Sequence, residues 1–164
     1  MHKSLITKVV YPSIVLSLIV GCTGIATSER FRAETVSPIA QDVQSRRVSQ
    51  IAVYSLAPGQ ETFVAVTCDA LRELSDQSAK TNLVGQIQLE LLESLEKTHA
   101  RAAKREGDMR WRAELLRRDG ACLHTICLDG WGTIATFDGR PARINSPLRK
   151  WFKKHFPRKR PRTA

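Results

Sequence analysis

The segment CLHTICLDGWGTIATFDG, residues 122–139, indicates the fold more clearly than any other part of the sequence. The runs from Cys122 to Leu128 and from Trp131 to Phe137 are rich in apolar and β-branched residues, and they predict two strands. Asp129-Gly130 between them is typical of a tight hairpin turn, in which both central residues take positive φ. A second Asp-Gly pair, residues 138–139, follows the second run. We therefore expect the globular domain to end there and a tail to begin.

A second hairpin is predicted farther upstream. Val48 to Leu56 and Glu61 to Cys68 are again apolar or β-branched runs. The connection between them is Ala57-Pro58-Gly59-Gln60, with Pro and Gly in the order of a turn. The two hairpins would supply the strands of a mostly antiparallel sheet.

Two helices are predicted between the hairpins. Asn82 is a suitable cap for a long helix that ends before Gly107, because apolar residues recur after it at steps of three and four. The apolar face of this helix consists of Val84, Ile87, Leu91, Leu95, Thr98 and Ala102. Asp108 is expected to cap a shorter helix that runs through Arg118. The sequence thus predicts a small α+β domain over residues 48–138, with two β-hairpins bracketing two helices.

The net charge of +10 is confined to the C-terminal segment, residues 139–164. Ten of the 26 Lys and Arg residues lie in this segment and no Asp or Glu does, so the 16 acidic residues of the chain balance the other basic residues. A neutral body argues against a nucleic-acid-binding domain with a broad basic face. We expect an ordinary globular body that carries a separate basic arm.

The basic arm is predicted to begin with a short amphipathic helix. Ser146 and Pro147 suit the start of the helix and Pro157 suits its end, and a disordered Arg-Lys cluster follows. A basic helix with aromatic anchors is typical of interfacial membrane binding. The predicted membrane- or anion-binding residues are Arg149, Lys150, Trp151, Phe152, Lys153, Lys154, Phe156, Arg158, Lys159, Arg160 and Arg162.

Two other interpretations of the basic arm stay open. In the cytoplasm the same stretch would be typical of a nucleic-acid-binding arm. A solvated tail that only improves solubility is the second alternative. The compartment, and therefore the N-terminus, decides between a membrane and nucleic acid.

The N-terminus has the order of an export signal. Lys3 and Lys8 precede an uncharged apolar run from Val9 to Val20, and small residues follow. The two lysines keep the N-terminus in the cytoplasm by the positive-inside rule, so the rest of the chain is expected outside. There, anionic lipid or envelope polymer is the expected partner, and nucleic acid is less favoured.

Ile19-Val20-Gly21-Cys22 resembles the lipobox of bacterial lipoproteins, and the resemblance covers only the first 22 residues. It implies a signal peptide over residues 1–21, a diacylglyceryl thioether on Cys22, and acylation of the new amino terminus by a fatty acid such as palmitate. Thr23 follows the cysteine where inner-membrane lipoproteins often have Asp, which favours the outer membrane. Residues 22–47, polar and without a sustained period, are expected to form a flexible tether.

Two alternatives to lipidation stay open at the N-terminus. The stretch from Val9 to Ser28 is uncharged and about as long as a membrane-spanning helix needs to be, so it could be an uncleaved anchor. Gly24 and Ala26 are small residues at the spacing that ordinary signal peptidase uses, so the chain could also be secreted without lipid.

The cysteines suggest one disulfide. If Cys22 carries lipid, Cys68, Cys122 and Cys127 remain, so we predict one bridge and one free thiol. Cys68 ends one predicted strand and Cys122 begins another, which makes their pairing the first choice and Cys68 with Cys127 the second. Pairing of Cys122 with Cys127 is disfavoured, because an extended strand separates them by about 16 Å.

No residue pattern names a reaction. Cys122, His124 and Cys127, with Cys68, could supply zinc ligands, but the spacing matches no recognised zinc motif. A Cys122–His124 nucleophile pair would need an orienting partner that the sequence does not display. Phosphate-binding loops, Ser nucleophile elbows and carboxylate motifs are also missing. We therefore expect no catalytic residues, no metal and no cofactor.

The function expected from the sequence is that of a cell-envelope lipoprotein. It would be a structural or interaction component whose basic arm contacts anionic membrane or envelope polymer, with other envelope proteins as further partners in an envelope-spanning assembly. The alternative is a membrane-anchored nucleic-acid-binding protein that uses the same arm.

Overall fold

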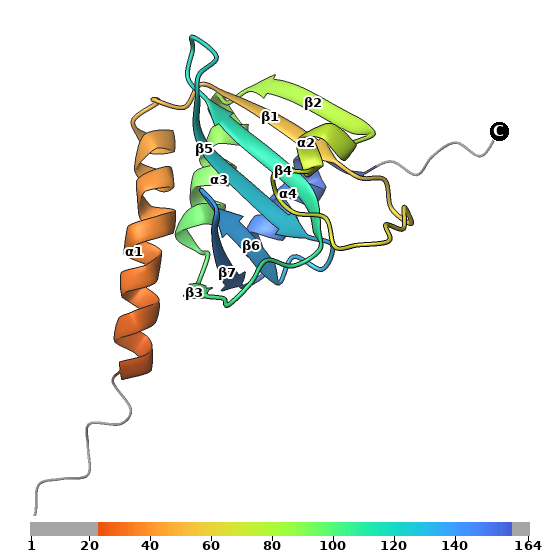
Figure 1. Cartoon of the computed structure of the whole chain (residues 1–164). Helices are drawn as coiled ribbons and strands as arrows, with labels where there is room; N and C mark the ends of the chain where they lie inside the picture. The colour runs from red at the N-terminus through yellow and green to blue at the C-terminus, as the bar shows by residue number, and fades with distance from the viewer. Residues whose placement is uncertain (1–22, 159–164) are drawn as a thin grey trace, which may run out of the picture.

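The protein folds around one antiparallel β-sheet of seven strands in the order β2-β1-β4-β5-β6-β7-β3 (Figure 1). The structure, a computed structural model, describes residues 23–158. The strands are β1 (Gln50–Ser55), β2 (Gln77–Asn82), β3 (Ala100–Ala102), β4 (Met109–Leu116), β5 (Cys122–Asp129), β6 (Ile134–Phe137) and β7 (Arg140–Ile144). The helices are α1 (Thr23–Gln44), α2 (Leu71–Leu74), α3 (Gly85–Glu96) and α4 (Pro147–His155). The predicted α+β class and the antiparallel sheet are confirmed.

The hairpin predicted for residues 122–137 is present, but its turn differs from the prediction. β5 pairs with β6 from Ile126 opposite Phe137 onward. The residue with positive φ in the connection is Gly132, rather than Asp129 or Gly130. The Asp129 carboxylate instead orders the connection by accepting hydrogen bonds from the backbone N–H groups of Thr133 and Ile134 at 2.8 and 3.2 Å.

The second Asp-Gly pair makes a tight turn and does not end the domain. Asp138 and Gly139 both have positive φ, 50° and 77°, and Phe137 pairs with Arg140 on the far side of the turn. Such a two-residue turn matches the twist of the strands on either side. The domain therefore continues through β7 and α4, and the prediction of a tail from residue 139 is wrong.

The upstream hairpin is also corrected. Glu61 to Cys68 is a loop, and β1 pairs with β2 on one side and with β4 on the other. The predicted long helix begins at Gly85 and ends at Glu96, and residues 100–102 form β3 instead. The helix begins at Gly85, which has φ of 57°, so its N-cap is Val84, two residues after the predicted cap at Asn82.

The predicted helix over residues 108–118 is strand β4. Trp111 and Leu115 are four residues apart, a spacing that fits one helix face and one strand face equally. Ala113 between them is buried in the same core, which is the alternation of a strand. β4 lies between β1 and β5, so its backbone hydrogen bonds are satisfied on both edges.

Residues 23–44 form helix α1, so the prediction of a flexible tether is wrong over this range. Val36, Ile39 and Val43 are fully buried and lie at steps of three and four, which places them on one helix face. The other positions are mostly polar, and this low overall hydrophobicity concealed the stripe. Near the middle of the helix, Arg32 donates hydrogen bonds to the carbonyl oxygens of Thr98 and Glu96 at 3.1 and 2.7 Å.

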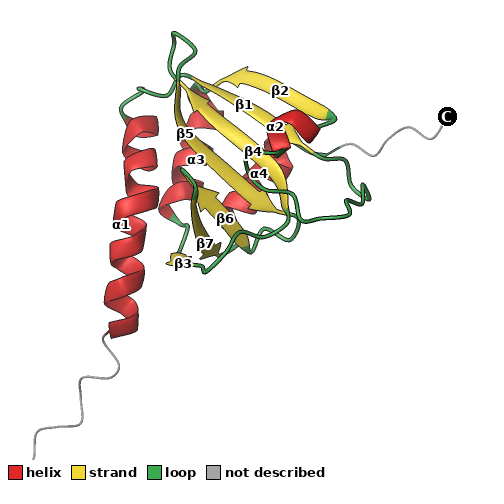
Figure 2. Cartoon of the chain, in the orientation of Figure 1, coloured by secondary structure: helices red, strands yellow, loops and turns green. Residues whose placement is uncertain are grey.

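The sheet has two unequal cores. α1, α3 and α4 cover one face, and the short α2 lies on the other (Figures 1 and 2). The larger core joins the three helices to the inward residues of six strands, all except β2. The smaller one, under α2 and the loop before it, consists of Leu56, Val66, Cys68, Leu71, Met109 and Cys127.

The disulfide joins Cys68 to Cys127, with 5.7 Å between their Cα atoms. The first choice, Cys68 with Cys122, is wrong, and the second choice is confirmed. Cys127 lies in the smaller core beside Cys68, whereas Cys122 pairs with Leu116 at the other end of β5 and is exposed and free. No helix among residues 23–158 is both long and apolar enough to cross a bilayer.

His124 connects α1 to the sheet. Its Nε2 lies 3.0 Å from Oδ2 of Asp42 in α1, and its Nδ1 lies 2.8 Å from Oδ2 of Asp138 in the β6–β7 turn. The hydrogen bond with Asp138, followed by the one with Asp42, raises the pKa of the imidazole against the opposing effect of burial. The protonated ring can donate to both carboxylates at once.

We expect the contact of His124 to make stability depend on pH near neutrality. Because the pKa is raised in the folded protein, the stabilisation is fully present below the unfolded value of about 6.5 and is lost as pH rises through the folded value. Urea unfolding between pH 5.5 and 8.5 should show a loss of about 1 kcal/mol in the wild type, the size of a partly exposed ion pair. His124→Gln should remove this slope, and parallel curves for the two proteins would contradict the assignment.

The disulfide is expected to account for a large share of the stability. It closes a loop of 59 residues, for which chain entropy gives about 4 kcal/mol. Cys68→Ser with Cys127→Ser should lower the free energy of unfolding by about that amount, and Cys122→Ser, the matched control, should change it by less than about 0.5 kcal/mol. Peptide mapping without reduction should recover Cys68 joined to Cys127; a peptide that contains a Cys68–Cys122 bond would refute the pairing.

Candidate anion-binding site

The basic residues of α4 project to two different surfaces. Arg149 and Lys153, four residues apart, line a cavity of about 560 Å³ together with Arg158. Lys150 and Lys154, also four apart, line a separate hollow between α3 and α4. The structure therefore divides the predicted binding residues into two groups. Cys22, Lys159, Arg160 and Arg162 lie outside the described residues.

Other predicted residues are committed to the fold. Trp151 and Phe152 are buried in the larger core, so they are not available as membrane anchors, which corrects that prediction. Phe156 is half-buried against the same core. Lys154 Nζ lies 2.7 Å from both carboxylate oxygens of Glu90, and together with Gln86 and His155 it lowers the pKa of Glu90 to about 2. These contacts join α4 to α3.

The cavity beside Arg149, which we call the cationic pocket, is bounded by four segments. They are the loop after β1, the start of β4, the β5–β6 connection and α4 with the residues that follow it. The lining residues are Ala57, Gly59, Gln60, Glu61, Thr62, Asp108, Arg110, Asp129, Gly130, Trp131, Arg149, Lys153 and Arg158.

Arg110 fixes one wall of the cationic pocket. Its guanidinium donates to the Asp108 carboxylate through Nε, at 2.9 Å, and through Nη2. Its Nη1 donates to the backbone oxygen of Gln60 at 2.9 Å. Arg110 is thus neutralised by Asp108 and at the same time holds the loop after β1 against the start of β4.

Arg149 reaches the pocket because residue 132 is glycine. A Cβ at Gly132 would lie 2.3 Å from Cδ of Arg149, closer than atoms of folded proteins approach. The alkyl part of Arg149 therefore packs directly on the backbone of the β5–β6 connection. Its Nε is buried and has no hydrogen-bond partner among the described residues.

Arg158 brings a third guanidinium to the pocket. It lies over the ring of buried Trp111, 4.2 Å from the centroid, and Nη1 donates to the Leu56 carbonyl at 3.4 Å. Burial, and then the positive charges of Arg110 and Arg149, lower the pKa of Arg158. Like charges therefore face one another across the pocket.

The acidic residues of the pocket form no ion pair with Arg149, Lys153 or Arg158. Asp108 is paired with Arg110. Asp129 is buried and accepts hydrogen bonds from Thr133 and Ile134. Glu61 is exposed on the loop. Arg149, Lys153 and Arg158 have no carboxylate partner among residues 23–158.

An anion is the chemical species that this arrangement suits. A phosphate or carboxylate between Arg149 and Arg158 would accept hydrogen bonds from two guanidinium groups and reduce the repulsion between them. Charge suits phosphate and carboxylate equally. The choice between them rests on the apolar residues of the neighbouring segments.

Three exposed apolar side chains belong to the segments that form the pocket. Trp131 lines it and is 76% exposed. Phe63 and Val64 follow directly after Thr62 in the pocket wall, and both project into solvent. All three lie in segments whose sequence predicts strands, and only the fold shows them at the surface.

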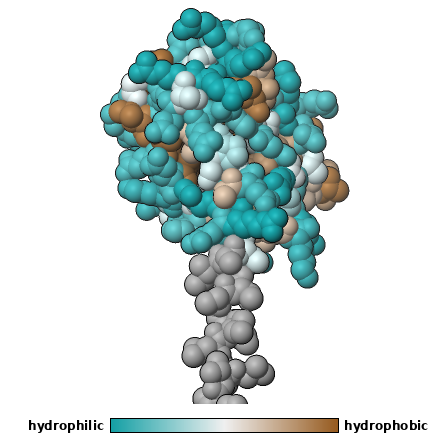
Figure 3. All heavy atoms as spheres, turned by 90° about the vertical axis from the view of Figure 1, so that its left-hand side faces the viewer, coloured by the Kyte–Doolittle hydropathy of each residue, from teal (hydrophilic) through white to brown (hydrophobic). Residues whose placement is uncertain are grey.

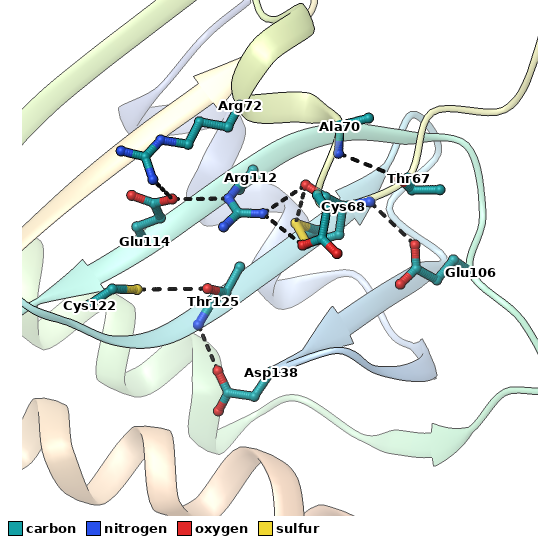
Figure 4. A network of polar contacts seen from close by, with 12 residues as sticks. Thr67, Cys68, Ala70, Arg72, Glu106, Arg112, Glu114, Cys122, Thr125 and Asp138 are labelled. Atoms are coloured by element: carbon teal, nitrogen blue, oxygen red, sulfur yellow. Dashed lines mark hydrogen bonds and ion pairs between the residues drawn. A yellow bond between two sulfur atoms is a disulfide. The ribbon is translucent and has the colours of Figure 1, made fainter.

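The loop that carries Phe63 and Val64 is fixed at its far end as well. Arg112 Nη1 donates to the Cys68 carbonyl at 2.9 Å, and Arg112 Nε donates to Glu114 at 3.1 Å (Figure 4). The backbone N–H of Cys68 donates to Glu106 at 3.3 Å (Figure 4). With the disulfide, these contacts hold the loop to the face of the sheet on which α2 lies.

The residues considered for thiol or metal chemistry have other contacts. Both ring nitrogens of His124 face carboxylates, and Cys122 Sγ contacts the His124 carbonyl at 3.4 Å and the Thr125 hydroxyl at 3.8 Å. No group of three or more His, Cys, Asp or Glu side chains suited to a metal ion occurs in the described part of the chain. Cys68 and Cys127 are joined in the disulfide.

Comparison of the chain with protein families, with curated proteins and with solved structures gives no match. We therefore classify the protein by its structure, as an antiparallel α+β domain with a cationic pocket.

Gly132→Ala is expected to disturb the pocket and the fold together. The substitution introduces both the strain of φ +66° and the clash with Arg149. Gly120→Ala is the matched control, because Gly120 has φ +86° with no atom near the added Cβ. Gly120→Ala should lower the free energy of unfolding by about 1 kcal/mol and Gly132→Ala by about 2–3 kcal/mol. Equal losses would show that Arg149 does not pack on Gly132.

Proposed function

We propose that the chain is a cell-envelope lipoprotein whose folded domain binds an anionic surface. Cys22 would carry the lipid, with residues 1–21 as the signal peptide, and the domain would face the periplasm or the exterior, preferably at the outer membrane. The protein would act as a structural or interaction component without catalysis. The observation that carries the proposal is the group of three cations, Arg149, Lys153 and Arg158, without carboxylate partners around one cavity.

The position of α1 supports a domain held close to its anchor. α1 begins at Thr23, directly after the proposed lipid site, and its side chains bind the body from Ser28 onward. A helix in place of a coil would restrict how far the domain can move from the bilayer. The side of the molecule that α1 occupies is mainly hydrophilic, with only small separate hydrophobic areas (Figure 3). This surface suits exposure to water better than insertion into lipid.

A membrane-anchored nucleic-acid-binding protein is the alternative function. Phosphodiesters of DNA or RNA would satisfy the same guanidinium groups. The cavity and the basic residues after Pro157 fit this function electrostatically. The export signal at the N-terminus favours the envelope over nucleic acid.

The proposal is tested by binding of the full chain to a set of surfaces. The acyl chains alone should hold the protein on phosphatidylcholine vesicles, so we expect stronger retention when phosphatidylglycerol is added, and weaker binding to duplex DNA at 150 mM salt. Each cation near an anionic bilayer contributes about 1 kcal/mol, so Arg149→Gln and Arg158→Gln should each reduce the response to anionic lipid about fivefold.

The control for charge is Arg143→Gln, at an exposed β7 position outside the pocket. It changes the net charge by the same amount and should have a smaller effect than either pocket variant. Intact mass after membrane extraction should give a triacylated chain that begins at Cys22. Preference for DNA, together with a chain that keeps Met1 and carries no acyl group, would overturn the proposal.

A further inference from the structure

The loop between β1 and α2 presents an apolar tip on a fixed base. On the pocket side, Arg110 binds the Gln60 carbonyl, and on the other side the Val66 N–H donates to Asp108 at 3.0 Å. The Met109 N–H donates to the Val66 carbonyl at 2.8 Å, and the disulfide holds Cys68. Residues 61–65 lie between these points, and Phe63 and Val64 project from them into solvent.

Exposure of this tip is not explained by packing within the described part of the chain. Phe63 is fully exposed, and Val64 is 75% exposed. Loop tips normally carry small polar residues, and single apolar side chains at a surface are common. Here two adjacent apolar residues directly follow the pocket residue Thr62, and exposed Trp131 lines the cationic pocket, so this surface combines apolar side chains with cations that have no carboxylate partner.

The chemistry of the partner follows from the two kinds of residue together. Trp combines an apolar ring with a polar N–H and is enriched where hydrocarbon meets headgroups. Arg and Lys around apolar side chains bind the negative headgroups of the same layer. A soluble polyanion would satisfy the cations but would leave Phe63 and Val64 in water. An anionic bilayer satisfies both.

We propose that Phe63, Val64 and Trp131 insert into the interface of an anionic bilayer while the cationic pocket receives the phosphate of a lipid headgroup. This inference rests on the proposed function and names the anionic surface. It replaces the buried Trp151 and Phe152 as the residues that contact lipid. The lipid phosphate would lie among Arg149, Lys153 and Arg158, next to the inserted tip.

Insertion is tested with a polarity-sensitive dye at the tip of the full-length, acylated chain. Cys122 is the free cysteine of the described residues, so Cys122→Ser prevents labelling there. Val64→Cys then provides the labelling position. The dye should shift to the blue and be quenched by brominated lipid when phosphatidylglycerol is added to phosphatidylcholine vesicles. A dye at Val84→Cys, an exposed apolar position of 63% before α3, should show neither change.

Association is tested with paired serine variants at exposed positions, where loss of the fold is not expected. The readout is the lipid concentration that gives half of the blue shift of a dye at Trp131→Cys. Phe63→Ser with Val64→Ser should raise this concentration at least tenfold. Val84→Ser with Leu89→Ser, at positions 63% and 61% exposed, should leave it within twofold.

The outcomes separate this inference from the proposed function. If anionic vesicles still bind the domain through Arg149 and Arg158 but the Val64 dye stays in water, insertion is refuted and the proposed function stands. If neither anionic lipid nor Arg149→Gln changes any signal, both fail. Displacement of the domain from vesicles by duplex DNA at equal phosphate concentration would also overturn the choice of a bilayer.

Discussion

The burial of Leu148, Trp151 and Phe152 against the sheet is the interaction on which the site depends. Without it, the basic residues of α4 would belong to a flexible tail with no defined geometry. With it, one face of the helix is fixed, so Arg149 and Lys153 point to the pocket while Lys150 and Lys154 point to α3. A segment that looks like an electrostatic appendage in sequence is thus one wall of a folded cavity.

The fold could be predicted where local chemistry and tertiary structure agree. The β5–β6 hairpin and α4 have strong local signals, and both are present. β4 was mistaken for a helix because Trp111 and Leu115 satisfy both periods, and only pairing with β1 and β5 selects the strand. α1 was missed since a polar helix with three buried apolar residues is stabilised by its packing on the rest of the domain rather than by its own composition. These errors concern tertiary contacts, which a single sequence does not contain.

The same distinction applies to the site. Arg149, Lys153 and Arg158 were predicted from charge, but charge did not separate them from Lys154, which is bound to Glu90. Arg110, Trp131 and Phe63 were missed because their significance lies in which segments the sheet brings together. Gly132 carries no sequence signal of its own, yet it allows Arg149 to approach the β5–β6 connection. The pocket is a property of four chain segments that are up to about a hundred residues apart.

The central claim is that Arg149, Lys153 and Arg158 form one anion site and that basic residues outside the cationic pocket do not. The NMR signals of the arginine side-chain Nε–Hε groups report this directly. The full chain is held in nanodiscs and titrated with a short-chain phosphatidylglycerol. The account predicts saturable shifts of the Arg149 and Arg158 signals at the same lipid concentration, with the Arg143 signal unchanged. Equal, non-saturating shifts of all three would contradict it, because they would show a diffuse electrostatic effect instead of a site.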